Sequence, residues 1–195
     1  MRIAIYSGSF DPVHTGHAML ASWVGQSGIV DEIWLTVSRH NPLKASQTHA
    51  SGRHRLAMAR LVAQRATGVL ASDIELSMPV PSYTYRTLCE LRSRYPQHQF
   101  ILLIGADNWL NFSNWLNSRE IIDEFGLLIY PRPGINVDTA TLPANIRYLE
   151  DAPIADISST SIRLGLASGR NESFFLPDDV YAYIQAHNLY TLSNN

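Results

Sequence analysis

The chain of 195 residues has very little cysteine and almost no excess charge. Cys89 is its one cysteine, which excludes an internal disulfide and is typical of a reducing compartment. The formal net charge of −2 excludes a chain-wide basic field that would hold the protein on nucleic acid or on an anionic membrane. Any phosphate binding must therefore depend on local groups.

Long apolar runs are missing as well. The first apolar run ends in polar residues after Tyr6, and no segment has the roughly 20 apolar residues that cross a membrane. We therefore expect a cytoplasmic protein without a membrane partner. Lysine is equally scarce, because Lys44 is the one lysine among fifteen basic residues.

Short apolar strands and amphipathic helices alternate along the chain. Hydrophobic periodicity predicts strands over residues 3–6, 33–37, 100–104, 125–129 and 146–149, and helices over 15–26, 53–66, 84–94, 159–167 and 177–185, with a short helix around 121–122. Such alternation calls for a parallel sheet covered on both faces. We expect an α/β fold: one domain over residues 1–195, with a Rossmann-like doubly wound parallel sheet of about five to six strands and a small C-terminal helical segment.

Polar clusters follow three of the predicted strands directly, at residues 7–17, 38–44 and 105–115. The carboxyl ends of parallel strands meet at one edge of a sheet, and ligands bind there near the topological switch. We therefore expect these clusters to converge on one site. The Pro- and Thr-rich segment 131–143 is expected to be a surface loop.

The first cluster contains Gly8-Ser9-Phe10-Asp11-Pro12-Val13-His14-Thr15-Gly16-His17, which we call the first motif. Gly8 allows a tight turn after a strand, and Gly16 lets the amides at a helix start approach a ligand. Thr15 is the predicted N-cap of that helix. The free N–H groups and partial positive charge of a helix start suit a phosphate.

His14 and His17 are spaced so that both imidazoles can donate to a phosphate at that helix start. A two-histidine metal site is the alternative interpretation, but no third ligand stands nearby and the zincin spacing is absent. The glycine spacing also differs from the dinucleotide fingerprint and from the P-loop. We predict no metal ion held by the protein itself.

A second set of hydroxyls and amides lies at residues 157–163, Ile-Ser-Ser-Thr-Ser-Ile-Arg, which we call the last motif. Ser158 or Ser159 is the predicted N-cap of the helix that follows. Arg163 lies about one turn into it, where its guanidinium can clamp a polyphosphate with two parallel bonds.

The first motif resembles the HxGH signature of a nucleotidyltransferase superfamily, and the last motif resembles the ISSTxIR motif of its adenylyltransferases. Pro81–Leu88 resembles the PSYTxxTL segment of the nicotinate-nucleotide adenylyltransferase branch, and Thr84 can also cap the helix that follows. Further matches are Gly105-Ala106-Asp107 to the GxD motif, Phe112-Ser113-Asn114-Trp115 to F-x-x-W, Pro131–Gly134 to a turn that borders the adenine in some relatives, and Leu176–Tyr190 to the C-terminus. Leu43 and Arg86 depart from the family pattern.

This resemblance implies a set of site residues. The catalytic groups it implies are His14, His17 and Arg163. The ATP-binding residues it implies are Gly8, Ser9, Phe10, His14, Gly16, His17, Gly105, Asp107, Ser158, Ser159, Thr160 and Arg163. The acceptor-binding residues it implies are Ser7, Lys44, Tyr83, Thr84 and Trp115. Among these, Asp107 would accept from the ribose hydroxyls, Trp115 would stack on a pyridine ring and Lys44 would meet the acceptor phosphate.

The resemblance also implies a reaction. ATP, with Mg2+, would give its adenylyl group to nicotinate mononucleotide and form nicotinate adenine dinucleotide and pyrophosphate, a step of NAD biosynthesis without a nucleic-acid partner. Nicotinamide mononucleotide and phosphopantetheine are the alternative acceptors, and a non-catalytic nucleotide sensor is the alternative class. Cytidylyl transfer is disfavoured because the R-T-E-G-I-S-T signature is absent. Self-association stays open.

Overall fold

The structure, a computed structural model, describes residues 1–39 and 50–191. Its strands are β1 Arg2–Gly8, β2 Glu32–Val37, β3 Val69–Ser72, β4 Gln99–Gly105, β5 Leu127–Tyr130 and β6 Ile146–Tyr148. They form one six-stranded sheet in the order β3-β2-β1-β4-β5-β6, and every neighbouring pair is parallel. The predicted doubly wound parallel sheet is therefore confirmed.

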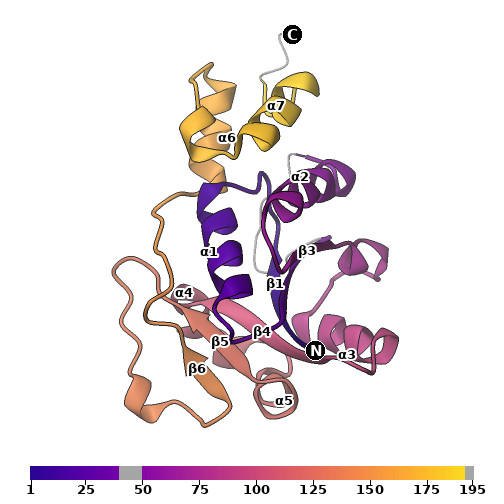
Figure 1. Cartoon of the computed structure of the whole chain (residues 1–195), viewed down its shortest axis with the longest axis vertical. Coiled ribbons are helices and arrows are strands. Elements are labelled where there is room, and N and C mark those ends of the chain that lie inside the picture. The colour runs from indigo at the N-terminus through magenta and orange to yellow at the C-terminus, as the bar shows by residue number, and fades with distance from the viewer. Residues whose placement is uncertain (40–49, 192–195) are drawn as a thin grey trace.

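Helices connect the strands throughout (Figure 1). The α-helices are α1 Thr15–Gln26, α2 Gly52–Arg65, α3 Thr84–Arg94, α4 Ala106–Trp109, α5 Ser118–Glu124, α6 Ser159–Ala167 and α7 Asp178–Ala186. The 3-10 helices are η1 Ile74–Ser77, η2 Phe112–Asn114, η3 Thr139–Thr141 and η4 Ser173–Phe175. None of the helices in the described part of the chain is long and apolar enough to cross a membrane.

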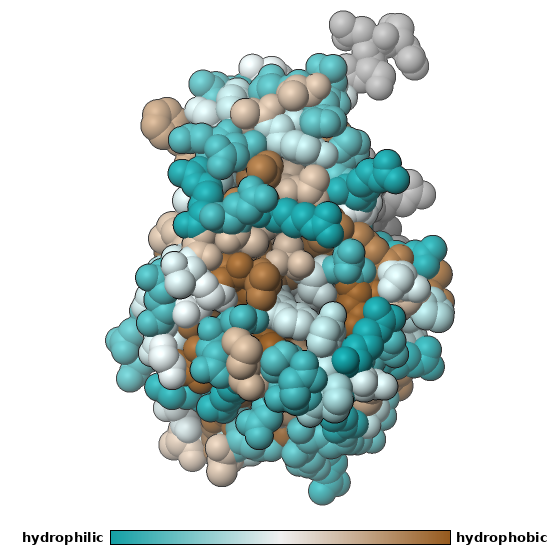
Figure 2. Space-filling view, turned by 45° about the vertical axis from the view of Figure 1, so that its right-hand side comes forward, coloured by the Kyte–Doolittle hydropathy of each residue, from teal (hydrophilic) through white to brown (hydrophobic). Residues whose placement is uncertain are grey.

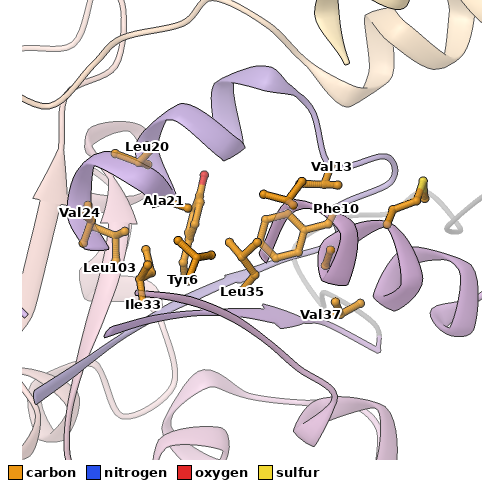
Figure 3. Close-up of a cluster of buried hydrophobic side chains, with 14 of the residues drawn as sticks. Tyr6, Phe10, Val13, Leu20, Ala21, Val24, Ile33, Leu35, Val37 and Leu103 are labelled. Carbon is orange, nitrogen blue, oxygen red and sulfur yellow. The ribbon is translucent and has the colours of Figure 1, made fainter. Parts of the chain in front are cut away.

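Side chains of each central strand alternate between two apolar cores. Ala4 and Tyr6 of β1 join a core with α1, α2, α6 and α7, whereas Ile3 and Ile5 join a second core with α3, α5 and the η2 segment. Because both faces of the sheet are covered, the strands are apolar along their whole length rather than on alternate residues. Figure 3 shows the first of these cores between α1 and the strands below it.

The sheet reverses its strand order between β1 and β4, so the two connections that leave these strands run to opposite faces. The loop after β1 leads into α1, and β4 leads directly into α4. Figure 1 shows α6 and α7 beyond the start of α1, at the end of the molecule opposite the N-terminus. This arrangement brings the last motif to the carboxyl edge of the sheet, where the first motif begins. Figure 2 shows hydrophobic residues gathered at the narrowing between this upper part and the larger body.

Several elements of the fold, among them α4 within the polar cluster 105–115, were not predicted from the sequence. Strand β3, which pairs with β2 at the edge of the sheet, was not predicted, because Val69–Ser72 is only 4 residues long and its apolar run is short. Segment 131–143 is largely exposed, as expected of a surface loop, but it contains the short 3-10 helix η3.

Candidate active site

A cavity of about 600 Å3 opens at the carboxyl ends of β1 and β4. Both motifs and the segments after β1, β2 and β4 contribute to its wall, which confirms that the polar clusters converge. The predicted site residues that line it are Ser7, Gly8, Ser9, Phe10, His14, His17, Tyr83, Thr84, Gly105, Asp107, Trp115, Ser158, Ser159, Thr160 and Arg163. Gly16 does not line the cavity, and Lys44 lies outside the described residues.

The N-cap of α1 is His14 and not Thr15, which is the first residue of the helix. The His14 Nδ1 atom accepts a hydrogen bond from the backbone N–H of His17 at 3.4 Å, and the His17 Nδ1 atom accepts one from the backbone N–H of His14 at 3.2 Å. The two residues thus form a reciprocal capping box. The prediction of Thr15 was wrong because imidazole nitrogens replace the hydroxyl that usually caps a helix.

These two backbone bonds fix the tautomers of the rings. A neutral imidazole whose Nδ1 accepts a hydrogen bond carries its hydrogen on Nε2. The rings are stacked with centroids 3.6 Å apart and planes 24° apart, so both present the same kind of donor on the same side of the helix start. Two parallel N–H donors beside the amides of a helix start suit the oxygens of a polyphosphate.

Burial keeps His14 neutral. The side chain is 5% exposed, and desolvation together with the positive charge of Arg132 lowers the pKa of His14 to about 4. The Nε2–H of this ring is therefore a donor without a net charge at neutral pH. Charge neutralisation in the cavity must come from other groups.

Phe10, rather than Gly8, takes the left-handed backbone conformation of the first motif, with a φ of 47°. The Phe10 ring packs over the strand end, where a Cβ on Gly8 would lie 3.1 Å from it. Gly16 has a similar steric role, because a Cβ there would lie 3.0 Å from Ala155 and 3.2 Å from the His14 ring. The glycines therefore make room for neighbouring side chains.

The last motif contacts the first motif directly. Ser158 is the N-cap of α6 and accepts from the backbone N–H of Ser161, which settles the choice between Ser158 and Ser159. The Ser159 hydroxyl donates to the Pro12 carbonyl at 2.9 Å, and the Arg163 Nη1 donates to the Asp11 carbonyl at 2.7 Å. Residues about 150 apart in sequence thus form one wall of the cavity.

Arg163 does not present its whole guanidinium to the cavity. Its Nη1 holds the Asp11 carbonyl, and its Nη2 donates to the Thr160 hydroxyl at 3.3 Å. Within the described part of the chain, the buried Nε has no hydrogen-bond partner. The expected clamp on a polyphosphate therefore has to use guanidinium N–H groups that do not donate to the Asp11 carbonyl.

The opposite wall carries the predicted acceptor residues. Helix α3 begins at Thr84 with Tyr83 as its N-cap, and no side chain caps it, so the prediction of Thr84 as the cap was wrong. Trp115 is half-buried against Phe112, with ring centroids 5.2 Å apart. The remaining part of its face contributes to the cavity wall.

Asp107 and Arg132 form an ion pair at the end of β4, with 3.5 Å between Oδ1 and Nε. Gly105 is required there, because a Cβ would collide with the Asp107 carboxylate. The sequence marked the turn around Arg132 but not its side chain, which lines the cavity. Arg132 supplies a positive charge that neutral His14 lacks.

The sequence-based analysis also missed two buried charges. Glu75 is 3% exposed and lines the cavity beside Ser7 and Ser82. Arg55 is 1% exposed and donates to the backbone carbonyls of Ser9, Ser38 and Ala50. Neither lies in a recognisable motif, and only the fold brings them to the site.

The described residues include no group of three or more His, Cys, Asp or Glu side chains that could hold a metal ion. A second groove of about 800 Å3 lies between α1, α2 and the start of α7. It is larger than the cavity at the strand ends, but residues of both motifs are almost absent from its lining. We therefore assign the chemistry to the cavity at the strand ends.

The fold and the cavity define a class of protein. A doubly wound parallel sheet places two helix starts, two imidazole donors and two arginines around one cavity at its switch point. This is the arrangement of a Rossmann-like nucleotidyltransferase, which holds a nucleoside triphosphate by its phosphates.

Comparisons with known proteins agree. A family model described as cytidylyltransferase-like matches residues 5–165. A protein named probable nicotinate-nucleotide adenylyltransferase from Bacteroides fragilis (strain YCH46) is 41% identical over 183 residues, which cover 94% of this chain and 90% of that protein. A protein of the same name from Bacteroides thetaiotaomicron is 39% identical over 195 residues, which cover 100% of this chain and 96% of that protein.

A solved structure has the same fold. The Plasmodium falciparum nicotinic acid mononucleotide adenylyltransferase complexed with NaAD superposes with a TM-score of 0.81 at 21% identity and covers 97% of both chains. The chain belongs to the cytidylyltransferase-like family and, within it, to the nicotinate-nucleotide adenylyltransferases. It is a nucleotidyltransferase.

Proposed function

We propose that the protein transfers the adenylyl group of ATP to nicotinate mononucleotide and releases pyrophosphate, as a step of NAD biosynthesis. The observation that carries this proposal is the contact between the two motifs. Ser159 and Arg163 donate hydrogen bonds to the backbone of the first motif. The stacked rings of His14 and His17 lie in the same motif. One wall of the cavity thereby gathers donors for a triphosphate. The relatives named nicotinate-nucleotide adenylyltransferase support the choice of acceptor.

The reaction needs positioned groups more than a general base. The acceptor phosphate is anionic near neutral pH and attacks the α-phosphorus of ATP in line with the departing pyrophosphate. His17 and the amides at the start of α1 stabilise charge that develops on the α-phosphate. His14 and Arg163 hold the departing pyrophosphate. The tautomers fixed by the capping box support these roles, because both rings donate from Nε2.

The other subsites follow from the cavity wall. Gly8, Ser9 and Phe10 border the phosphates, and Ser158 and Thr160 of the last motif add hydroxyls to the same wall. Asp107 accepts from the ribose hydroxyls of ATP, and Gly105 keeps the space that its carboxylate needs. Ser7, Tyr83, Thr84 and Trp115 form the acceptor side, and Lys44 meets the acceptor phosphate.

ATP enters as its complex with Mg2+, held mainly by the phosphates and by water. A cytoplasmic location and the absence of a nucleic-acid partner belong to the same proposal. The assembly state is left to experiment.

Pyrophosphate release with ATP and a panel of acceptors tests this proposal. The panel contains nicotinate mononucleotide, nicotinamide mononucleotide and phosphopantetheine. We expect the highest kcat/KM with nicotinate mononucleotide, together with formation of nicotinate adenine dinucleotide. A higher kcat/KM with another acceptor would refute nicotinate mononucleotide as the acceptor. If no acceptor increases the release of pyrophosphate, the proposed adenylyl transfer is refuted.

A further inference from the structure

Two buried carboxylates, Asp11 and Glu75, line the cavity, and the buried Arg55 lies behind its wall. The exposed fractions are 2% for Asp11, 1% for Arg55 and 3% for Glu75. The positive charge of Arg55 interacts with both carboxylates. Burying charges is costly even when they are paired, so a triad of this kind seldom stabilises a fold by itself and indicates another role.

Glu75 connects three segments on the acceptor side of the cavity. Its Oε1 accepts from the Ser7 hydroxyl at 2.9 Å, and its Oε2 accepts from the Ser82 hydroxyl at 3.1 Å. Ser82 immediately precedes Tyr83, the N-cap of α3. The end of β1, the 3-10 helix η1 and the start of α3 therefore share one carboxylate.

Arg55 connects the segments that flank these contacts. Its Nη1 donates to the Ser9 carbonyl and to the Ser38 carbonyl, both at 2.7 Å, and its Nε donates to the Ala50 carbonyl at 3.2 Å. Ser9 belongs to the first motif and Ser38 follows β2. Arg55 thus fixes the first motif relative to the segments before and after residues 40–49.

We propose that Glu75 is a positioning residue for the acceptor. The proposal rests on the proposed function and adds a residue to it. Glu75 orients the Ser7 hydroxyl and holds the segment Ser82-Tyr83-Thr84, so that Tyr83 and the amides at the start of α3 face the acceptor. Direct contact of Glu75 with an anionic acceptor would be repulsive, which is why its role is exerted through Ser7 and Ser82.

Substitution of Glu75 should weaken binding of the acceptor and spare binding of ATP. Glu75→Gln keeps the shape but places an amide donor where two hydroxyls now donate, so one of the serine contacts must rearrange. We expect the KM for nicotinate mononucleotide to rise about tenfold and the KM for ATP to change less than about twofold. Ser82→Ala, which leaves Glu75 in place, should give the same pattern with a smaller change.

Glu172→Gln is the matched control. Glu172 is also a buried glutamate, 6% exposed, but it pairs with Arg170 and does not line the cavity. A loss of stability without a change in either KM is expected. An equal change in acceptor KM for Glu172→Gln would show that any buried charge has this effect, and it would overturn the assignment to Glu75.

Calorimetric titration separates this inference from the proposed function. Nicotinate mononucleotide and a non-hydrolysable ATP analogue are titrated separately into the unmodified chain, Glu75→Gln, Ser82→Ala and Glu172→Gln. We expect Glu75→Gln and Ser82→Ala to bind the mononucleotide more weakly than the unmodified chain does. Their affinity for the ATP analogue should not change. Binding by the unmodified chain without such a difference overturns the role of Glu75, whereas no binding of the mononucleotide to the unmodified chain overturns the proposed acceptor as well.

Discussion

Two histidines at the start of α1 are the smallest unit of the proposed mechanism. Each ring accepts the backbone N–H of the other residue, so each keeps its hydrogen on Nε2. The sequence indicated a phosphate site from the spacing of these residues. It could not indicate the capping box, because a histidine at an N-cap is uncommon.

His17→Ala should lower kcat by about 10²–10³-fold, because one donor to the developing charge is lost. The fold should persist, since the substitution removes one bond of a capping box at the helix surface. Steady-state turnover and a thermal unfolding curve check both parts. His187→Ala is the control, because His187 is exposed on the C-terminal side of α7, outside the cavity. Near-normal kcat in His17→Ala would remove His17 from the mechanism.

His14 should make stability depend on pH. The folded-state pKa of His14, about 4, lies below the usual value of 6.5, so the unfolded chain binds the proton more readily between these values. The contribution of neutral His14 is fully present above about pH 6.5 and is lost as the pH falls toward 4.

His14→Asn keeps a side-chain oxygen that can cap the helix but does not titrate. Urea unfolding measures how much stability each protein loses between pH 7 and pH 4. The loss should be smaller in His14→Asn than in the unmodified chain by on the order of 3 kcal/mol. Equal losses in the variant and the unmodified chain would mean that His14 titrates normally.

Helix α6 and the loop after β1 are the two elements whose contact forms the phosphate wall. The helix bounds and both motifs could be predicted, because apolar periodicity and cap residues are local signals. The contact between them could not, since it depends on how the chain returns after β6. Strand β3 was missed for a similar reason: its pairing with β2, not its composition, makes it a strand.

Ser159→Ala should weaken the binding of ATP more than the binding of the acceptor. The hydroxyl of Ser159 donates to the Pro12 carbonyl, so its loss loosens the contact between the motifs. We expect the KM for ATP to rise about fivefold, the size of one neutral hydrogen bond. Ser168→Ala, which removes a hydroxyl from the other end of the same helix, should leave both KM values unchanged. A larger rise in the acceptor KM for Ser159→Ala would contradict this arrangement.

At the scale of the whole molecule, the last described residues contact the first motif, near the start of the sequence. The Tyr190 hydroxyl donates to the Asp11 Oδ1 at 2.7 Å across 179 positions of sequence. Burial, followed by the charge of Asp11, raises the pKa of Tyr190, so the hydroxyl remains a donor at neutral pH. The C-terminal segment Leu176–Tyr190 was matched to the family by its sequence alone. Its contact with the first motif could not be predicted from sequence, as was also true of Arg55 and Glu75.

Tyr190→Phe should lower the free energy of unfolding by about 2 kcal/mol, because a hydrogen bond to a buried carboxylate is lost. Tyr181→Phe on α7 is the control. Within the described part of the chain the Tyr181 hydroxyl makes no hydrogen bond, so we expect little change. Urea unfolding of both variants measures the difference. Equal stability of Tyr190→Phe and the unmodified chain would mean that the tail is not held by this bond.

The central claim is that the protein transfers an adenylyl group in the cavity where the first and last motifs contact each other. Incubation with ATP labelled at the α-phosphorus and nicotinate mononucleotide tests it most directly. We predict that the label enters a dinucleotide in the unmodified chain and that His17→Ala reduces the rate by about 10²–10³-fold. Label that leaves as AMP at a rate independent of the mononucleotide would contradict the claim.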